Sequence, residues 1–234
     1  MSHEAALELD GLKGLVGSRG ISVFGVADLS SHPLEVRYVP AAVAAGLNRG
    51  IVLGYRMSDM VIESLIDRPT STYRYHYRQA NLYLDSAASA VVAWLQEKGY
   101  GAFPVPSSQI VDWRENKGHV WHVAVACLSG AAWWGRNNLA VTEAYGARVR
   151  YATVLTDMPL PAGAALRRDC GDCRECIRAC PVGAIGNSPE EFDLEKCHTL
   201  LKKFSKELSL GVRICGLCVK ACAGRRSWRP TTQG

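Results

Sequence analysis

The sequence predicts a layered α+β (or α/β) fold for residues 1–160 and a separate cysteine-rich domain for residues 161–234. Helical and strand-like segments alternate through the first part, which holds one cysteine, whereas eight of the nine cysteines lie between Cys170 and Cys222. A chain of 234 residues has room for one large domain or two small ones. Alternating helices and strands predict a sheet covered by helices.

The elements of the first domain are predicted from apolar spacing and from helix-breaking residues. Leu7, Leu12 and Leu15 recur at helical spacing, and Pro104 and Pro106 forbid a helix around them. In chain order we expect a helix at 6–18, strands at 21–29 and 50–57, a long helix at 80–99, an extended segment at 101–106, a helix at 119–130 and a strand at 149–160.

Composition is that of an ordinary globular protein. Hydrophobic residues make up 48%, charged residues 21% and the formal net charge is +5, values that exclude a disordered, collagen-like or coiled-coil chain. The first ten residues carry three acids and no Lys or Arg, and no apolar run approaches the ~20 residues of a membrane span. We therefore expect a cytoplasmic protein with no membrane partner, whose cysteines bind metal rather than form disulfides.

The first cysteine group has the spacing of bacterial two-cluster ferredoxins. The run CGDCRECIRACP places cysteines at 170, 173, 176 and 180, in the pattern C-x2-C-x2-C-x3-C-P. The short steps wrap the chain around one cluster, and the fourth cysteine faces a second cluster. A zinc ribbon, the simpler interpretation besides buried thiols, uses paired C-x2-C units and has no need of this run. The spacing therefore predicts two 4Fe–4S clusters.

The second group, CGLCVKAC, holds only three cysteines, at 215, 218 and 222. Counting accounts for the eight ligands if the two groups exchange one cysteine each. The first cluster then takes Cys170, Cys173, Cys176 and Cys222, and the second takes Cys180, Cys215, Cys218 and one more. Cys197 is the best candidate for that place and Cys127 is its competitor, although an apolar helical stretch around Cys127 favours a buried thiol.

The C-terminal part is basic. Residues 197–234 contain eight Lys or Arg and a single acid, Glu207. This charge can compensate for negatively charged clusters, or it can form a docking face for RNA phosphates or an acidic electron donor. Aromatic residues are not interleaved with most of these charges, which favours compensation.

An amide-rich segment is the unusual feature of the first domain. Arg136, Asn137 and Asn138 are adjacent there, between two apolar elements, and a wholly structural segment would seldom need two neighbouring amides. The glycines at 14–20 lack the G-x-G-x-x-G spacing of a dinucleotide site, and the sequence contains no Walker A run and no D-x-H-x-x-G.

These residues resemble motifs of the epoxyqueuosine reductases. The run from Trp133 to Gly146 is similar to that family's G-W-x-G-K-N-T-L-L-x5–6-G-S, Leu155–Asp157 to its L-T-D strand end, and Arg74–His76 to its D-Y-H. The cysteine pattern is similar too, over a resemblance that spans about residues 60–230. It implies a nitroreductase-like mixed sheet with flanking helices that holds a base-off cobalamin, and a two-cluster ferredoxin-like module that passes electrons to the cobalt. Reductive dehalogenases share that layout.

Carried over by position, the resemblance implies roles for individual residues. The cluster ligands would be Cys170, Cys173, Cys176 and Cys222, and Cys180, Cys197, Cys215 and Cys218. The residues near the corrinoid would be His76, Arg136, Asn137, Asn138 and Thr199. The implied electron donor is a reduced flavodoxin or ferredoxin.

Two departures concern the substrate. The family's catalytic Asp corresponds to Asn116, and an amide cannot donate a proton as a carboxylic acid does. His119 and His122 are the alternatives that we favour as proton donors, with Asp112 and Glu115 nearby. The sequence ends before the family's helical-repeat RNA-binding region, so we expect tRNA to be a poor substrate.

Three functions stay open on the sequence. The first is a cobalamin-dependent iron–sulfur reductase. The second is a corrinoid-binding redox helper that reduces or transfers the corrinoid and has no organic substrate. The third is a ferredoxin-like electron carrier without corrinoid, which is weaker because it leaves the first domain without a role.

Overall fold

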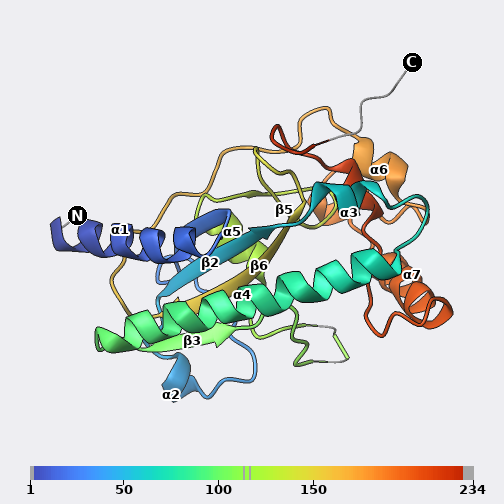
Figure 1. The fold of residues 1–234 in the computed structure, drawn as a ribbon. Helices are drawn as coiled ribbons and strands as arrows, with labels where there is room; N and C mark the ends of the chain where they lie inside the picture. The colour runs from blue at the N-terminus through green and yellow to red at the C-terminus, as the bar shows by residue number, and fades with distance from the viewer. Residues whose placement is uncertain (1–2, 113, 116, 229–234) are drawn as a thin grey trace. The chain divides into compact units, whose positions relative to one another are not determined.

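The computed structural model describes residues 3–112, 114–115 and 117–228, and Figure 1 shows the order of their helices and strands. The chain divides into two compact units, each made of several segments. The first unit comprises residues 1–56, 80–133 and 150–167, and the second comprises 57–79, 134–149 and 168–234. The cysteine-rich segment thus shares a unit with two earlier segments, and the domain boundary after residue 160 stays a prediction.

A four-stranded sheet organises the first unit. Its strand order is β1 (Val23–Asp28), β2 (Arg49–Arg56), β6 (Val149–Thr156), β3 (Ala102–Val105). β1 pairs with β2 and β3 pairs with β6, both antiparallel, with Pro104 opposite Val154. Pro104 has no N–H to donate, and the edge position of β3 tolerates it. The predicted α/β character is therefore confirmed, with antiparallel strand pairs.

Helices bury their apolar faces against this sheet. In α4 (Ser71–Glu97), Leu84, Ala88, Val91 and Leu95 recur at helical spacing. They share one core with residues of α1 (His3–Ser18), β2 and β6. The short helix α5 (His122–Leu128) contacts β1 and β2, and α2 (Ala41–Ala44) is a single turn.

The second unit is built from short elements. They are α3 (Asp59–Glu63), β4 (Trp133–Trp134) paired with β5 (Ala140–Val141), α6 (Glu175–Ala179), η1 (Pro189–Glu191), α7 (Leu194–Glu207) and α8 (Leu217–Ala221). Asp193 caps α7 by accepting the Lys196 N–H at 2.9 Å. A core that includes Met57, Ile62, Tyr73 and Leu217 joins α3 and the first turn of α4 to α8.

Two predicted helices differ in extent from the observed ones. α4 begins nine residues before the expected position 80 because Thr70 accepts the Tyr73 N–H at 3.1 Å and caps an earlier start. The helix expected at 119–130 covers only His122–Leu128. None of the helices in the described ranges combines the length and the apolar character that a bilayer span requires. The ferredoxin-like module stays a prediction.

Candidate functional site

Four thiols of the second unit form a first electrostatic group. Burial, together with the charges of Cys176, Cys170 and Cys173, raises the pKa of Cys222 to about 12, although the Ala147 N–H opposes the shift. Burial likewise raises the pKa of Cys176, with Cys170 and Cys173 contributing next. Cys222 is therefore close to the three cysteines of the C-x2-C-x2-C run, far from it in sequence.

The other four thiols form a second group. Burial, followed by the charges of Cys215 and Cys180, raises the pKa of Cys197 to about 11. Burial also raises the pKa of Cys218, which interacts with Cys215, Cys197 and Cys180 and with one thiol of the first group. The two groups therefore adjoin.

Cys127 has different surroundings. Burial raises its pKa to about 11, and no other cysteine contributes to that shift. It lies in the first unit near Tyr151, whose pKa is raised by burial and then by the charge of Cys127. Of the two competitors for the eighth position, Cys197 is the one that interacts with Cys215 and Cys180.

The two groups of thiols fit iron–sulfur clusters better than single metal ions. Across residues 3–112, 114–115 and 117–228, no three His, Cys, Asp or Glu side chains converge as ligands of one ion. A 4Fe–4S cluster is held by four cysteine thiolates, which is the number of thiols in each group. Thiols whose pKa values are raised by burial and then by neighbouring thiols need a cationic core before they can all ionise.

The segment 135–149 holds both halves of the first group. Arg136, only 8% exposed, donates from Nη2 to the Gly171 carbonyl at 2.7 Å, from Nη1 to that of Cys173 at 3.1 Å, and from Nε to that of Asn187. The Ala147 N–H donates to the Cys222 carbonyl at 3.0 Å. One short segment thus fixes the loop of Cys170–Cys173 and the distant Cys222.

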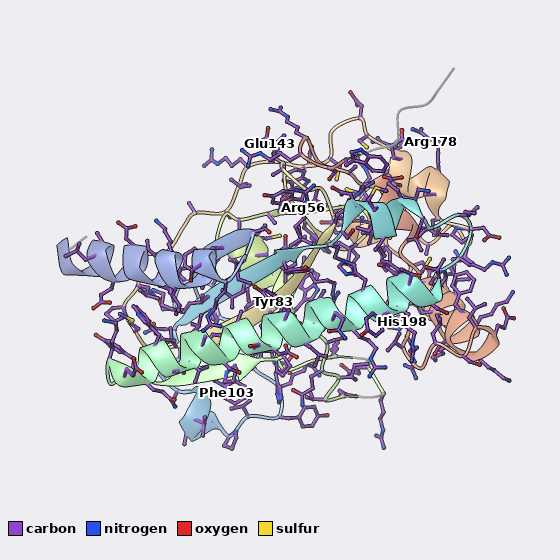
Figure 2. The ribbon with its side chains drawn as sticks, viewed as in Figure 1. Arg56, Tyr83, Phe103, Glu143, Arg178 and His198 are labelled. Carbon is purple, nitrogen blue, oxygen red and sulfur yellow. The ribbon has the colours of Figure 1, made fainter. Side chains whose placement is uncertain are left out.

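Gly146 permits this close approach. Its φ is +58°, and a Cβ there would lie 2.1 Å from the Cys222 carbonyl oxygen. Any side chain would therefore clash with backbone as well as strain the left-handed conformation. Glu143, labelled in Figure 2, adds ion pairs at 2.7 Å to Arg168 and 2.8 Å to Arg225, which flank the two halves of the group in sequence.

Arg148, in the same segment, anchors α8. It is 1% exposed and pairs with Asp59 at 3.1 Å and Glu63 at 2.6 Å. Its Nη2 also donates to the Lys220 carbonyl at 2.7 Å, between Cys218 and Cys222. Sequence reasoning missed this residue, although two arginines, Arg148 and Arg150, at the start of a strongly apolar strand were the available signal.

The predicted corrinoid-lining residues differ in how many hydrogen bonds their side chains already form. Asn137 is 3% exposed, and within the described part of the chain neither its Oδ1 nor its Nδ2 has a hydrogen-bond partner. Asn138, at φ +59°, accepts the Trp134 Nε1–H at 2.9 Å. Thr199 is exposed on α7. A buried amide without partners fits a polar ligand group, so Asn137 is the residue here that a cofactor would satisfy.

The candidate histidines are engaged in structural hydrogen bonds. His76 accepts the Ser58 N–H at 2.8 Å next to α3, and burial lowers its pKa. The His119 Nδ1 lies 2.7 Å from the Arg37 carbonyl oxygen, and its ring packs edge-on against Phe103, which is labelled in Figure 2. These contacts keep both rings fixed and use one nitrogen of each.

His122 is held at both nitrogens. Nε2 lies 3.1 Å from the Pro106 carbonyl and donates to it, so Nδ1 accepts from the Thr153 hydroxyl at 2.8 Å. Burial lowers the pKa of His122 to about 4. The neutral ring is a weak proton donor near pH 7.

The acidic alternatives remain ionised. Asp112 accepts the N–H groups of Glu115 and Arg114, which lowers its pKa. Glu115 pairs with Lys117 at 2.6 Å, and that contact lowers its pKa. Asn116, at the family's acid position, lies outside the described residues.

The pKa of His122 predicts a pH-dependent stability. The unfolded state binds a proton below about pH 6.5 that the folded state accepts only near pH 4, so stability is full above pH 6.5 and falls as the pH decreases. Between pH 7.5 and pH 5.5 this group should cost about 1 kcal/mol of unfolding free energy. Urea unfolding of wild type and His122→Gln at both pH values measures it, with His32→Gln at an exposed position as control. Equal pH dependence in all three proteins would contradict the prediction.

Comparisons with known proteins agree with the resemblance expected from the sequence. The chain is 30% identical to the epoxyqueuosine reductase of Leadbetterella byssophila over 111 residues, which are 44% of this chain and 36% of that protein. It is 28% identical to the tetrachloroethene reductive dehalogenase of Desulfitobacterium hafniense over 135 residues, covering 55% of this chain and 23% of that protein. No protein-family model matches the chain.

Solved structures show the same fold. A catabolic reductive dehalogenase in complex with 3-bromo-4-hydroxybenzoic acid gives a TM-score of 0.72 at 18% identity, over 92% of this chain and 31% of that one. A selenomethionine-labelled epoxyqueuosine reductase gives 0.62 at 18% identity, over 93% of this chain and 65% of that one. The chain spans less than two fifths of the length of the two curated relatives given above.

Proposed function

From this similarity in sequence and fold to epoxyqueuosine reductases and reductive dehalogenases, we propose that the chain is a cobalamin-dependent iron–sulfur reductase. The observation that carries the proposal is the grouping of eight thiols into two sets of four at ferredoxin spacing. In this proposal Cys170, Cys173, Cys176 and Cys222 hold one 4Fe–4S cluster, and Cys180, Cys197, Cys215 and Cys218 hold the other.

The bound groups would supply the redox chemistry. Each cluster would carry one electron, and the cobalt of a base-off corrinoid would be the site of reduction. The chain's own residues orient these groups. The Ala184 N–H donates to the Cys180 sulfur at 3.3 Å and orients it. The amide of Asn137, which has no hydrogen-bond partner in the described chain, would bind a polar group of the corrinoid. Asn138, Thr199 and His76 are the other residues proposed to line that site. The guanidinium of Arg136 is already occupied by backbone carbonyls, which argues for a role at the first cluster.

Partners and substrate follow from the chemistry of the surface. Lys202, Lys203 and Lys206 are exposed on α7, the helix that carries Cys197. A basic helix beside a cluster suits an acidic one-electron donor such as reduced flavodoxin or ferredoxin. One related reductase has been solved with an epoxyqueuosine-modified tRNA stem loop, and tRNA is the substrate that we doubt here because Asn116 replaces the acid.

The redox-helper function is the second candidate, and the state of His122 favours it. His122 is neutral and bonded at both nitrogens, so it is not well suited to protonate a substrate. Single-turnover assays with reduced protein and bound cobalamin separate the two functions. Conversion of epoxyqueuosine tRNA, of the free nucleoside or of 3-bromo-4-hydroxybenzoic acid supports the reductase, whereas reduction of the corrinoid with none of the three converted supports the helper.

We expect the corrinoid to bind without a histidine on cobalt. The sequence has no D-x-H-x-x-G, and His76 and His119 each use a ring nitrogen in a structural bond. The electron paramagnetic resonance spectrum of the cob(II)alamin complex should therefore lack nitrogen superhyperfine splitting. Splitting that disappears in His76→Ala or His119→Ala would contradict the prediction.

We expect Asn137→Ala to weaken cobalamin binding about tenfold or more, because a buried hydrogen bond contributes roughly 1–3 kcal/mol when its loss leaves a polar group unpaired. The cobalamin-free protein should lose no stability, since the amide has no partner there. Titration with cobalamin and urea unfolding measure the two effects.

Asn138→Ala is the matched control for this prediction. It removes the bond to Trp134 and places Ala at φ +59°, so it should destabilise the cobalamin-free protein. Destabilisation of the same size by Asn137→Ala, with cobalamin affinity unchanged, would refute a ligand role for Asn137.

A further inference from the structure

Arg136 is a buried cation that the protein itself does not neutralise. It is 8% exposed, and its three hydrogen bonds all go to backbone carbonyls. No carboxylate among the described residues forms an ion pair with it. A guanidinium does not deprotonate in a protein, and a buried charge is costly unless an opposite charge compensates for it.

Arg148 provides the internal comparison. It is the other arginine among the buried polar residues of the described chain, and it has two carboxylates, Asp59 and Glu63, within 3.1 Å. The same segment therefore carries one arginine that carboxylates neutralise and one, Arg136, that has no carboxylate partner. The difference points to an anion near Arg136 that is not a side chain.

The position of Arg136 identifies that anion. The carbonyls of Gly171 and Cys173, to which it donates, belong to the loop of the first cysteine group. We infer that Arg136 is the buried counter-charge of the cluster held by Cys170, Cys173, Cys176 and Cys222, and that it raises the reduction potential of that cluster. This inference rests on the proposed function, because it requires the clusters to be bound.

The effect follows from charge alone. Reduction adds one electron from an external one-electron reductant to the cluster, and no bond forms or breaks. A fixed positive charge in a low-dielectric site stabilises the more negative, reduced state. Of the two buried arginines in the described residues, Arg136 is the one without a carboxylate partner, and it contacts the loop of the first cysteine group. Its effect should therefore fall mainly on the first cluster.

The test is an anaerobic dithionite titration of the reconstituted full chain, followed by electron paramagnetic resonance. Arg136→Met should shift the first cluster to a more negative potential and leave the second unchanged. Arg136→Lys, which keeps the charge, should shift it much less. A Cys197→Ser background alters the signal of the second cluster and so identifies the signal that moves.

Arg174 is the matched control. Its Nη1 donates to the same two carbonyls, Gly171 at 2.9 Å and Cys173 at 3.2 Å, but the side chain is more exposed. Arg174→Met should shift the potential less than Arg136→Met, because water screens an exposed charge.

Each other outcome has a defined meaning. Equal shifts in Arg136→Met and Arg136→Lys, or no shift with both clusters present, would overturn the inference. If Arg136→Met loses the first cluster, Arg136→Lys decides. A first cluster that is retained at the wild-type potential in the Lys variant supports the counter-charge role, and loss of the first cluster in that variant overturns the inference. Wild-type protein without iron after reconstitution would refute the proposed function itself, and the inference with it.

Discussion

Cys222→Ala should remove one cluster and leave the other. Wild-type protein reconstituted anaerobically should contain about eight iron atoms per chain, and the variant about four, because alanine cannot replace a thiolate ligand. The thiol of Cys222 lies with those of Cys170, Cys173 and Cys176. We therefore expect the loss to fall on their cluster, and iron analysis with electron paramagnetic resonance measures it.

Double variants test which thiols share a cluster. Cys222→Ala combined with Cys173→Ala should lose no more iron than either single change, since both ligands serve one cluster. Cys222→Ala combined with Cys197→Ala should lose nearly all iron. Cys127→Ala, which changes a half-buried thiol outside both groups, should retain the wild-type content. Additive loss in the first double variant would show that the ligands are not crossed.

Arg148→Met should destabilise the protein by about 3–5 kcal/mol. Removing one partner of a buried ion pair leaves the other charge poorly compensated. Here Asp59 and Glu63 would both lose the guanidinium, and Glu63 would keep only the Lys220 ammonium at 3.9 Å. The Lys220 carbonyl would also lose its donor, beside two cysteines of α8. Anaerobic urea unfolding of the loaded protein measures the change.

Two further variants separate buried charge from the general loss of an arginine. Arg225→Met removes an exposed ion pair with Glu143 and should cost less than about 1 kcal/mol. Arg148→Met with Asp59→Asn and Glu63→Gln should recover part of the lost stability, because no buried carboxylate is then left without the guanidinium that balanced its charge. A cost below about 1 kcal/mol for Arg148→Met alone would refute the role of the network.

Much of the first unit could be predicted from the sequence because its elements follow local apolar patterns. The strands at 23–28, 49–56 and 149–156 fall within or one residue from the predicted ones. The early start of α4 could not be predicted from apolar spacing, since it depends on the Thr70 cap and on aromatic residues that pack in another core. The likeness to epoxyqueuosine reductases was also evident from the motifs.

The candidate site divides in the same way. Cysteine spacing along the chain indicated clusters, and adjacent amides marked a polar loop, because both signals lie in a few consecutive residues. The sequence did not predict the roles of Gly146 and Arg148, or that Arg136 would be buried without a carboxylate partner. Each of these features depends on which groups contact the residue in the folded chain. A single sequence does not distinguish a buried arginine from an exposed one.

The sequence by itself determined the kind of chemistry: eight thiols at ferredoxin spacing, a polar loop for a cofactor, and a family resemblance. Counting in the sequence already assigned the eight thiols to two sets. Only the tertiary structure shows what brings Cys222 to Cys170, Cys173 and Cys176, because the segment 135–149 packs against both parts of that group. It also decided which charges are balanced. The electrostatic energy of a charge depends on its burial and on its neighbours, and both are properties of the folded chain.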